Sequence, residues 1–306
     1  NSIVTLMSSI LRSFGCSSNY PELSLLKSKE LIPKTNVILL VIDGLGYQFL
    51  KNEYQESLLQ NALRGRISSV FPSTTASAIT TFLTGTAPQQ HAITGWNILL
   101  KELGVVATIL PFTSRMGVSL SSPHNIGKRI FTYPSVFEQI KSQSYYILPK
   151  KLANSVYTLA HVGVSKQIPV SGMGDLFQTI VKSVKENSRK KYIYAYWNQY
   201  DHISHMSGYN SVVAKQHVDQ IRGYMQSLIQ QIKETSSILI VTADHGFTNT
   251  SQAHTIELKD HPQLAACLSL PLCGESRAAY CYVKSSKREF FVAYIEKNLS
   301  QYMEVF

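Results

Sequence analysis

Short apolar runs alternate along the chain with stretches in which apolar residues recur at helical spacing. Three of these runs end in polar residues that could take part in binding or catalysis. They are 35–44 (TNVILLVIDG), 190–198 (KKYIYAYWN) and 236–246 (SSILIVTADHG). A short apolar run between polar boundaries predicts a strand of a parallel sheet that is covered on both faces. The run at 236–242 contains no charged residue, and we expect it to be a central strand.

The rest of the pattern continues this alternation. Further strands are predicted at 65–72, 105–112, 145–148 and 278–284, and helices at 73–85, 136–141, 174–186, 211–233 and 288–299. Helix 73–85 starts with Ser and Thr and ends at Gly85, which is the expected capping pattern. Strands that alternate with helices predict an α/β fold with three α/β/α layers around a mainly parallel central sheet.

The length of 306 residues suits one large α/β domain, and no linker divides the chain, so we expect a single domain over residues 1–306. Between about 113 and 172 the pattern becomes irregular and contains four prolines. We interpret 113–172 as a small cap insertion that covers the sheet and influences substrate choice.

The net charge of +10 and the pI of about 9.3 favour anionic partners such as phosphates. The chain has no dense block of Lys and Arg, only short runs such as Lys150-Lys151 and Lys190-Lys191, and no specific nucleic-acid motif is present. No apolar run is long enough for a transmembrane helix. We expect a soluble protein, with the cytoplasm favoured over secretion. The oligomeric state stays open.

The four cysteines, Cys16, Cys267, Cys273 and Cys281, form no CxxC pair, which argues against a structural zinc knot. A disulfide between Cys267 and Cys273 has no support beyond their spacing.

Ligand-type side chains follow three of the predicted strands. Asp43 follows the first, Asp201 and His205 follow the second at a spacing of four, and Asp244 with His245 follow the third. The carboxyl ends of strands in open α/β sheets are where ligands bind. Taken alone, Asp43 is typical of a strand-end turn, and Asp201 with His205 of a surface ion pair. A charged pair directly after a buried strand is costly unless it is paired or holds a metal.

With His254 added, the chain offers three aspartates and three histidines. Such a set can hold two divalent metal ions, zinc in the first place and manganese as the alternative. Two metal ions about 3.5–4 Å apart suit in-line displacement at phosphorus. A nucleophile is available at the start of helix 73–85, where backbone N–H groups favour an anion. Thr75 and Thr74 are the candidates, and N-capping by Ser73, Thr74 or Thr75 is the alternative interpretation.

At this point the chain resembles the type I phosphodiesterase/nucleotide pyrophosphatase family of the alkaline phosphatase superfamily. The resemblance covers roughly residues 36–283 and is carried by five segments: VIDG, FPSTTASAITTFLTG, APQQHAITGW, YDHISHMSG and TADHG. It implies an alkaline phosphatase-like fold. It also implies a nucleophilic threonine ten residues before Gly85, which is Thr75, with Thr74 as the fallback.

The resemblance implies one zinc ion held by Asp43, Thr75, Asp244 and His245, and a second held by Asp201, His205 and a later histidine. We choose His254 over His261, because "TADHG" followed by "AHT" resembles the cofactor-independent phosphoglycerate mutases of the same superfamily. Asn97 is the candidate to bind a phosphoryl oxygen, next to Trp96 at the family's asparagine position. Ala76 stands where nucleotide-cleaving relatives have Phe.

We therefore predict a metal-dependent hydrolase that cleaves phosphodiester or pyrophosphate bonds of a small phosphate ester or nucleotide through a phospho-threonine intermediate. Two alternatives stay open, a phosphomonoesterase of the same superfamily and a non-catalytic basic metal-binding protein. The ligand motifs contain no lysine or arginine for the additional charge of a monoester, which favours a diester.

Overall fold

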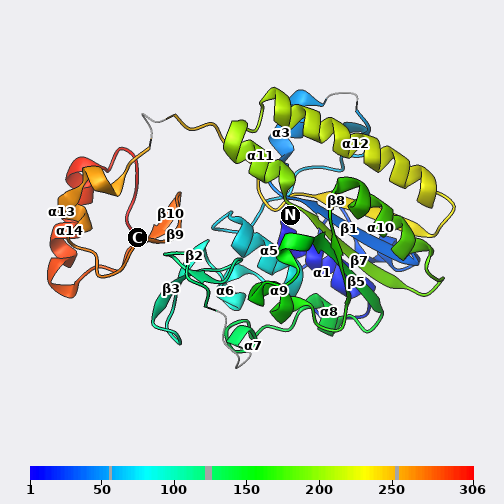
Figure 1. Ribbon diagram of the computed structural model, residues 1–306, viewed down its shortest axis with the longest axis horizontal. Coiled ribbons are helices and arrows are strands. Elements are labelled where there is room, and N and C mark those ends of the chain that lie inside the picture. Colours follow the sequence, from blue (N-terminus) through cyan, green and yellow to red (C-terminus); the bar gives the residue numbers. More distant parts are fainter. Residues whose placement is uncertain (55–56, 121–125, 252–254) are drawn as a thin grey trace.

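The computed structural model describes residues 1–54, 57–120, 126–251 and 255–306 (Figure 1). A five-stranded sheet forms its centre, with the order β6-β5-β7-β1-β8. The strands are β1 (Asn36–Ile42), β5 (Gln143–Pro149), β6 (Lys166–Val170), β7 (Lys191–Trp197) and β8 (Ser237–Thr242). All neighbouring pairs are parallel. The carboxyl ends of all five strands therefore lie at one edge of the sheet.

The register brings the ends of β1, β7 and β8 level with one another. Ile42, the last residue of β1, pairs with Trp197, the last residue of β7, and Val41 pairs with Thr242, the last residue of β8. Every residue of β1 and β7 is buried. The chain thus leaves three adjacent strands at the same height, and the side chains that follow them can meet.

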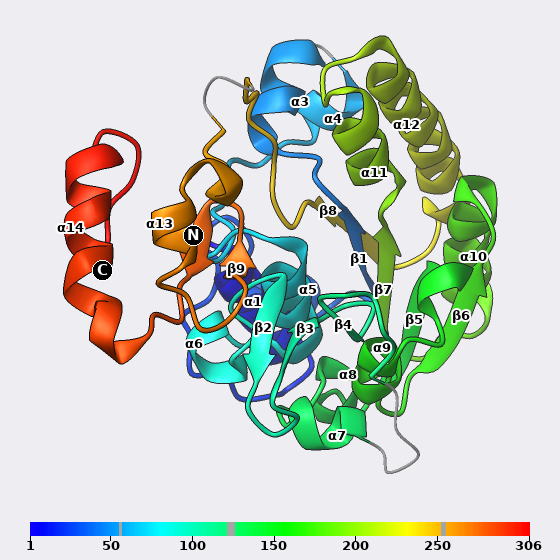
Figure 2. The same cartoon turned by 60° about the vertical axis from the view of Figure 1, so that its left-hand side comes forward.

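Alternate residues of β1 enter two cores, one on each face of the sheet. Val37, Leu39 and Val41 belong to one core, and Ile38, Leu40 and Ile42 to the other. The first core takes residues from α1 (Ile3–Ser13), α5 (Thr75–Thr84), α8 (Val136–Gln139) and α9 (Val156–His161). The second takes residues from α3 (Tyr47–Glu53), α4 (Leu58–Asn61), α10 (Met173–Lys185), α11 (Gln199–Ser207) and α12 (Val212–Ile232). This is the three-layer α/β/α fold that the sequence predicts (Figure 2).

A second, antiparallel sheet has the order β10-β9-β2-β3-β4. Its strands are β2 (Asn97–Leu100), β3 (Val105–Thr108), β4 (Thr113–Ser114), β9 (Cys273–Glu275) and β10 (Ala278–Tyr280). Next to it, α13 (Pro262–Ala265) and α14 (Arg288–Asn298) share a small core of their own, visible at the left of Figure 1. The cysteines are free, so Cys267 and Cys273 form no disulfide.

The remaining helices among the described residues are short. They are α2 (Ser28–Leu31), α6 (Pro88–His91), α7 (Ile126–Ile130) and the single 3-10 turns η1 (Lys150–Leu152), η3 (Leu258–Asp260) and η4 (Ser285–Lys287). In the part of the chain that the structure describes, no helix has the length and apolar character needed to cross a membrane.

Two predictions about the sheet are wrong. Strand β8 is an edge strand instead of a central one, and Val241 is 36% exposed. An apolar run does not reveal how many neighbours a strand has, because the side chains of β8 still reach both cores: Ile240 packs on the first and Leu239 on the second.

The interpretation of 113–172 as a cap over the sheet is also wrong, because the segment supplies β5 and β6 of the central sheet itself. The prolines that suggested an irregular insertion occupy permitted positions. Pro149 is the last residue of β5, and Pro169 lies in β6, which is an edge strand. Proline is tolerated at strand ends and sheet edges, where its missing N–H leaves no ladder bond unmade.

The strand predicted at 65–72 does not form. Ser68 makes an isolated bridge to Ser2, and the Ser69 hydroxyl donates a hydrogen bond to the carbonyl of Asp244. This segment therefore runs beside the end of β8 and leads the chain into α5.

Candidate metal centre and active site

Asp43 and Asp244 are buried at the end of the sheet and are connected through a tight turn. Asp43 donates its backbone N–H to the carbonyl of Trp197 at 2.9 Å. The following residue, Gly44, has φ +75°, and its N–H donates to Asp244 Oδ1 at 3.0 Å. Both carboxylates are almost inaccessible, with exposures of 2% and 0%. The turn after β1 thus holds the carboxylate that follows β8.

His245 places its Nε2 atom among four oxygen atoms from four chain segments. It lies 3.0 Å from Thr75 Oγ1, 3.4 Å from Asp43 Oδ1, 3.5 Å from Asp244 Oδ2 and 3.9 Å from Asp201 Oδ1. The site predicted from the ends of β1, β7 and β8 is therefore one compact cluster.

Asp201 and His205 reach this cluster from α11, the helix that follows β7. They lie one turn apart, and His205 Nε2 is 3.4 Å from Asp201 Oδ1. The Asp201 side chain is 19% exposed and that of His205 is 68% exposed. Asp201 therefore faces inward toward His245, while His205 lies at the rim.

Thr75 is the first residue of α5, and Thr74 is the N-cap. The Thr74 side chain makes no capping hydrogen bond, whereas Thr75 Oγ1 lies 3.5 Å from Asp43 Oδ1 as well as 3.0 Å from His245 Nε2. The hydroxyl of Thr75 therefore does not cap the helix. It belongs to the group of Asp43, Thr75, Asp201, Asp244 and His245, which we call the ligand cluster.

The cluster concentrates negative charge in a buried space. Burial and the nearby Asp244 and Asp201 raise the pKa of Asp43 well above its usual range, against the opposing effect of a hydrogen bond from Tyr196. Burial also raises the pKa of Asp201, while His205 and His245 act in the opposite direction. Carboxylates crowded in this way favour a bound cation, because it removes the repulsion that raises these pKa values.

The residues fit a divalent metal ion on two counts. Ligand atoms of Asp43, Asp244 and His245 all lie within 4.8 Å of one another. In addition, Asp244 Oδ2 and Asp201 Oδ1 are buried oxygens that have no hydrogen-bond partner among the described residues. Buried carboxylate oxygens are normally hydrogen-bonded, paired or metal-bound, and a mixed Asp/His set is one that zinc accepts.

The contacts of the other residues singled out in the sequence differ from one residue to the next. His254 lies outside the described residues. Its rival His261 accepts or donates a hydrogen bond with the Tyr294 hydroxyl at 3.0 Å, in the segment of α13 and α14. Asn97 is the first residue of β2, and its Oδ1 accepts a hydrogen bond from Thr108 at 2.9 Å. Ala76 is fully buried in α5.

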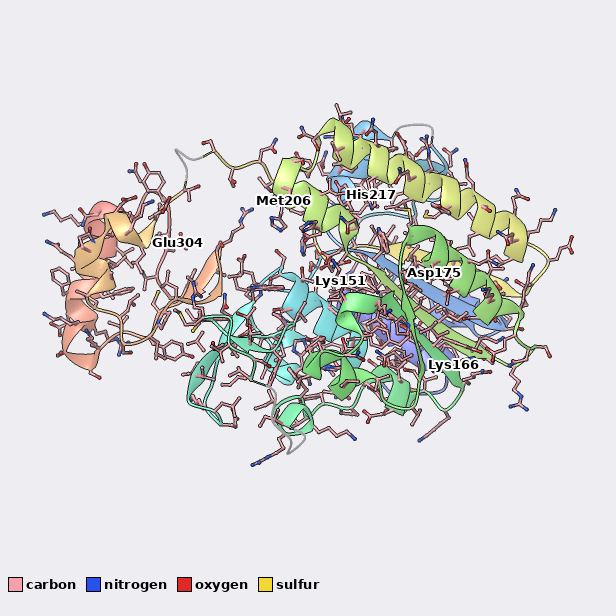
Figure 3. All side chains as sticks on the ribbon, in the orientation of Figure 1. Lys151, Lys166, Asp175, Met206, His217 and Glu304 are labelled. Carbon is pink, nitrogen blue, oxygen red and sulfur yellow. The ribbon has the colours of Figure 1, made fainter. Side chains whose placement is uncertain are left out.

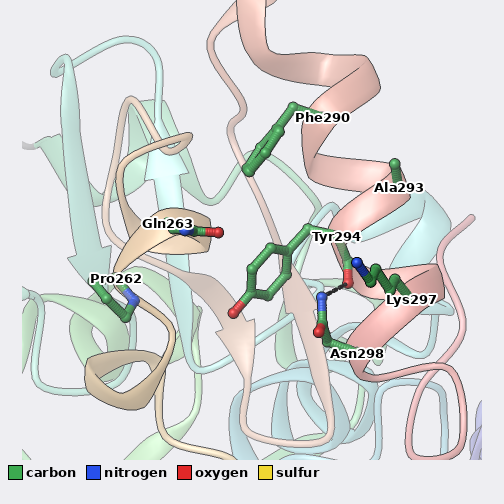
Figure 4. Close-up of a pocket in the computed structure, with 7 residues that line it drawn as sticks. All are labelled: Pro262, Gln263, Phe290, Ala293, Tyr294, Lys297 and Asn298. Carbon is green, nitrogen blue, oxygen red and sulfur yellow. Dashed lines mark hydrogen bonds between the residues drawn. The ribbon is translucent and has the colours of Figure 1, made fainter.

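A surface cavity of about 460 Å³ lies between α13 and α14, where Pro262 and Gln263 face Phe290 and Tyr294 (Figure 4). In Figure 1 these helices are separate from the end of the central sheet. None of the residues that line this cavity belongs to the ligand cluster, so we place the candidate active site at the cluster and not at the cavity.

Sequence reasoning missed two side chains that contact the cluster, those of Tyr196 and Phe247. The Tyr196 hydroxyl donates to Asp43 Oδ2. The ring of Phe247 makes edge contacts with His205 and His245 at centroid distances of 5.2 and 5.7 Å. His217, labelled on α12 in Figure 3, accepts a hydrogen bond from the Trp197 indole at 3.0 Å. Tyr196 lies within an apolar run, and only the register of β7 against β1 indicates that it lies near Asp43.

A known family matches most of the chain. The family model for type I phosphodiesterase/nucleotide pyrophosphatase matches residues 37–305. The chain belongs to this family. It is accordingly an enzyme of the phosphodiesterase and nucleotide pyrophosphatase kind, a hydrolase, as the motifs predict. No curated protein sequence matches the chain at a significant level.

Solved structures of ectonucleotide pyrophosphatase/phosphodiesterase 5 share the fold. The murine protein has 18% sequence identity and a TM-score of 0.62, with 86% of this chain and 70% of that chain covered. An inactive murine variant with a threonine replaced by alanine, in complex with AMP, has a TM-score of 0.60 at 18% identity and covers 84% and 68%. The human protein gives 0.58 at the same identity and coverage.

Proposed function

We propose that this enzyme hydrolyses phosphodiester or pyrophosphate bonds of small substrates in two steps, with Thr75 as the nucleophile. The observation that carries the proposal is the position of Thr75 Oγ1, which lies 3.0 Å from His245 Nε2 and 3.5 Å from Asp43 Oδ1 at the start of α5. A structural metal site has no need of a hydroxyl among its ligands. The non-catalytic alternative is therefore disfavoured.

Two divalent metal ions, zinc in the first place, would be held by two groups of residues. Asp43, Thr75, Asp244 and His245 form the first group, and Asp201 and His205 belong to the second, with His254 as its proposed third member. When bound, the metals lower the pKa of the nucleophilic hydroxyl and neutralise charge on phosphoryl oxygens. The protein's part is to hold these residues after three adjacent parallel strands and at the start of α5.

In the first step Thr75 Oγ1 forms a bond to phosphorus and the bond to the leaving oxygen breaks. Water then cleaves the phospho-threonine and regenerates the hydroxyl. The first N–H groups of α5 lie next to Thr75 and favour an anionic phosphoryl group. Asn97 is the proposed additional donor: its Oδ1 is engaged by Thr108, which fixes the amide and leaves the Nδ2 hydrogens for a phosphoryl oxygen.

A nucleotide is the leading substrate class, because the murine relative has been solved with AMP. Ala76 is small and buried, so this chain offers no aromatic side chain next to Thr75 on α5 to stack on a base. We therefore expect tolerance toward the leaving group in place of strict base recognition.

The test is the hydrolysis of an aryl diester and of the matching aryl monoester, with the same leaving group and the same zinc concentration. We expect the diester to be cleaved at least about tenfold better in kcat/KM, a transition-state difference of roughly 1.4 kcal/mol. The reason is that the ligand motifs provide no lysine or arginine for the additional charge of a monoester. A preference for the monoester would assign the enzyme to the phosphatases instead.

A further inference from the structure

Tyr196 lies directly beneath the ligand cluster. It is the sixth residue of β7 and pairs with Val41 of β1, two residues before Asp43. Its side chain is buried in the core on the α5 face of the sheet, and its hydroxyl donates a hydrogen bond to Asp43 Oδ2. The contact thus joins the carboxyl end of β7 to the residue that follows β1.

This hydrogen bond divides the two oxygens of Asp43 between two tasks. Oδ2 is held by Tyr196, while Oδ1 faces Thr75 Oγ1 at 3.5 Å and His245 Nε2 at 3.4 Å. A carboxylate that is fixed on one side cannot rotate freely about its last bond. The oxygen that remains is therefore presented in one direction, toward the nucleophile and the other ligands.

Two neighbouring tyrosines show that such a hydrogen bond is no general requirement of this core. Tyr192 and Tyr194 lie on the same strand and in the same core, and both are fully buried. Neither hydroxyl has a hydrogen-bond partner among the described residues. The fold therefore tolerates unpaired tyrosine hydroxyls here, and the pairing at Tyr196 is specific to Asp43.

We propose that Tyr196 is a positioning residue that locks the Asp43 carboxylate in the orientation needed for metal binding and for contact with Thr75. The inference rests on the proposed function, because it assigns Asp43 as a metal ligand. Groups that hydrogen-bond metal ligands typically change metal affinity or activity about tenfold to a hundredfold when removed.

The experiment compares Tyr196→Phe with Tyr194→Phe. Both variants remove one buried hydroxyl from the same face of β7, but only the first removes a hydrogen bond to a proposed ligand. Zinc is titrated into metal-free wild type and both variants by calorimetry, and the melting temperature of each metal-free protein is measured. We expect zinc binding at one site to weaken about tenfold or more in Tyr196→Phe and to stay unchanged in Tyr194→Phe. In turnover assays at saturating zinc, kcat should fall more than KM changes.

A variant with 4-aminophenylalanine at position 196 keeps a donor at the same place and should recover most of the lost zinc affinity. If Tyr196→Phe does not fold, 4-fluorophenylalanine fills the space of the hydroxyl without a proton to donate, and the same loss of affinity is expected. Failure of both to fold without metal would mean that the hydroxyl serves the fold, which overturns the proposal.

The outcomes separate the two levels of the argument. If wild type binds zinc and Tyr196→Phe binds it equally well, the positioning role is wrong and the proposed function stands. If wild type binds no zinc, the metal centre itself is wrong, and the role of Tyr196 is refuted with it.

Discussion

The start of α5 carries three consecutive hydroxyl residues, and their roles differ by their position on the helix. Thr74 precedes the helix in an extended conformation, while Thr75 is its first residue and meets His245. The sequence places the proposed nucleophile at Thr75 only through the family spacing to Gly85, because the residue types alone do not distinguish it from a capping residue. What separates Thr75 from Thr74 is the direction of its side chain, which depends on the helix start.

Thr75→Ala should therefore remove nearly all turnover, by on the order of a thousandfold or more, because the covalent route closes. Zinc binding should persist in part, since Asp43, Asp244 and His245 remain. Thr74→Ala is the matched control and should stay within about tenfold of wild type. Steady-state kinetics on an aryl diester measures both. An active Thr75→Ala together with an inactive Thr74→Ala would move the nucleophile by one residue.

His254 is the proposed third member of the second group of ligands, chosen over His261 through the resemblance of its sequence setting. His254→Ala should lower the zinc content from close to two ions per chain to close to one, as measured by elemental analysis. His261 contacts Tyr294, so His261→Ala should leave the zinc content unchanged. The reverse result would show that the wrong histidine was chosen.

At the scale of elements, the strands that carry the site could be predicted and their neighbours could not. The runs before Asp43, Asp201 and Asp244 are apolar and each forms a parallel strand, as expected. The pattern of apolar residues does not reveal the order of the strands, which is why β8 was expected in the middle of the sheet. The strand predicted at 145–148 forms as β5, but in the central sheet instead of a cap, and β6, which contains Pro169, was not predicted.

The turn between β1 and α3 depends on Gly44. Its φ is +75°, and a Cβ there would lie 2.4 Å from the ring of Phe247. We expect Gly44→Ala to destabilise the protein by about 1–3 kcal/mol, through both backbone strain and displacement of Phe247. Gly223→Ala is the control, because a Cβ in the middle of α12 would meet nothing within 4 Å. It should stabilise by about 0.5–1 kcal/mol. Denaturant unfolding decides, and equal stability losses would contradict the account.

Helix α9 carries a titratable group within the first core. Burial lowers the pKa of His161 to about 4, and its Nδ1 contacts the Tyr157 carbonyl at 2.8 Å. Because the folded pKa lies below the unfolded value of about 6.5, the unfolded chain binds more protons between these values. The free energy of unfolding should therefore be unaffected by His161 above about pH 6.5, and it should fall by roughly 3 kcal/mol toward pH 4.

Thermal melts from pH 8 to pH 4 measure this loss. His161→Asn keeps a donor for the Tyr157 carbonyl and removes the titration, so its melting temperature should depend less steeply on pH. Identical pH profiles for the two proteins would show that His161 does not contribute. His91, whose pKa burial lowers to about 3, contributes a further loss with the same sign in both proteins.

On the scale of the whole molecule, two cores cover the two faces of one parallel sheet, and the candidate site lies at the carboxyl ends of its strands. The C-terminal segment of α13 and α14 has a core of its own. The fold class could be predicted from the alternation of strands and helices, and the family from the order and spacing of the motifs. The residues that meet at the site could be predicted because they directly follow parallel strands. The side chains that contact these residues could not be predicted. Tyr196 contacts Asp43, and Phe247 contacts His205 and His245, and the apolar pattern does not reveal which residues of neighbouring elements lie side by side.

The central claim is that turnover of phosphodiesters depends on metal bound at this edge of the sheet. It is tested most directly by assaying one preparation on an aryl diester before chelation, after removal of the metal by a chelator, and after the return of zinc. We predict loss of nearly all activity on chelation and its recovery with zinc. A chelated protein that contains no metal by elemental analysis and still turns over at the original rate would contradict the account.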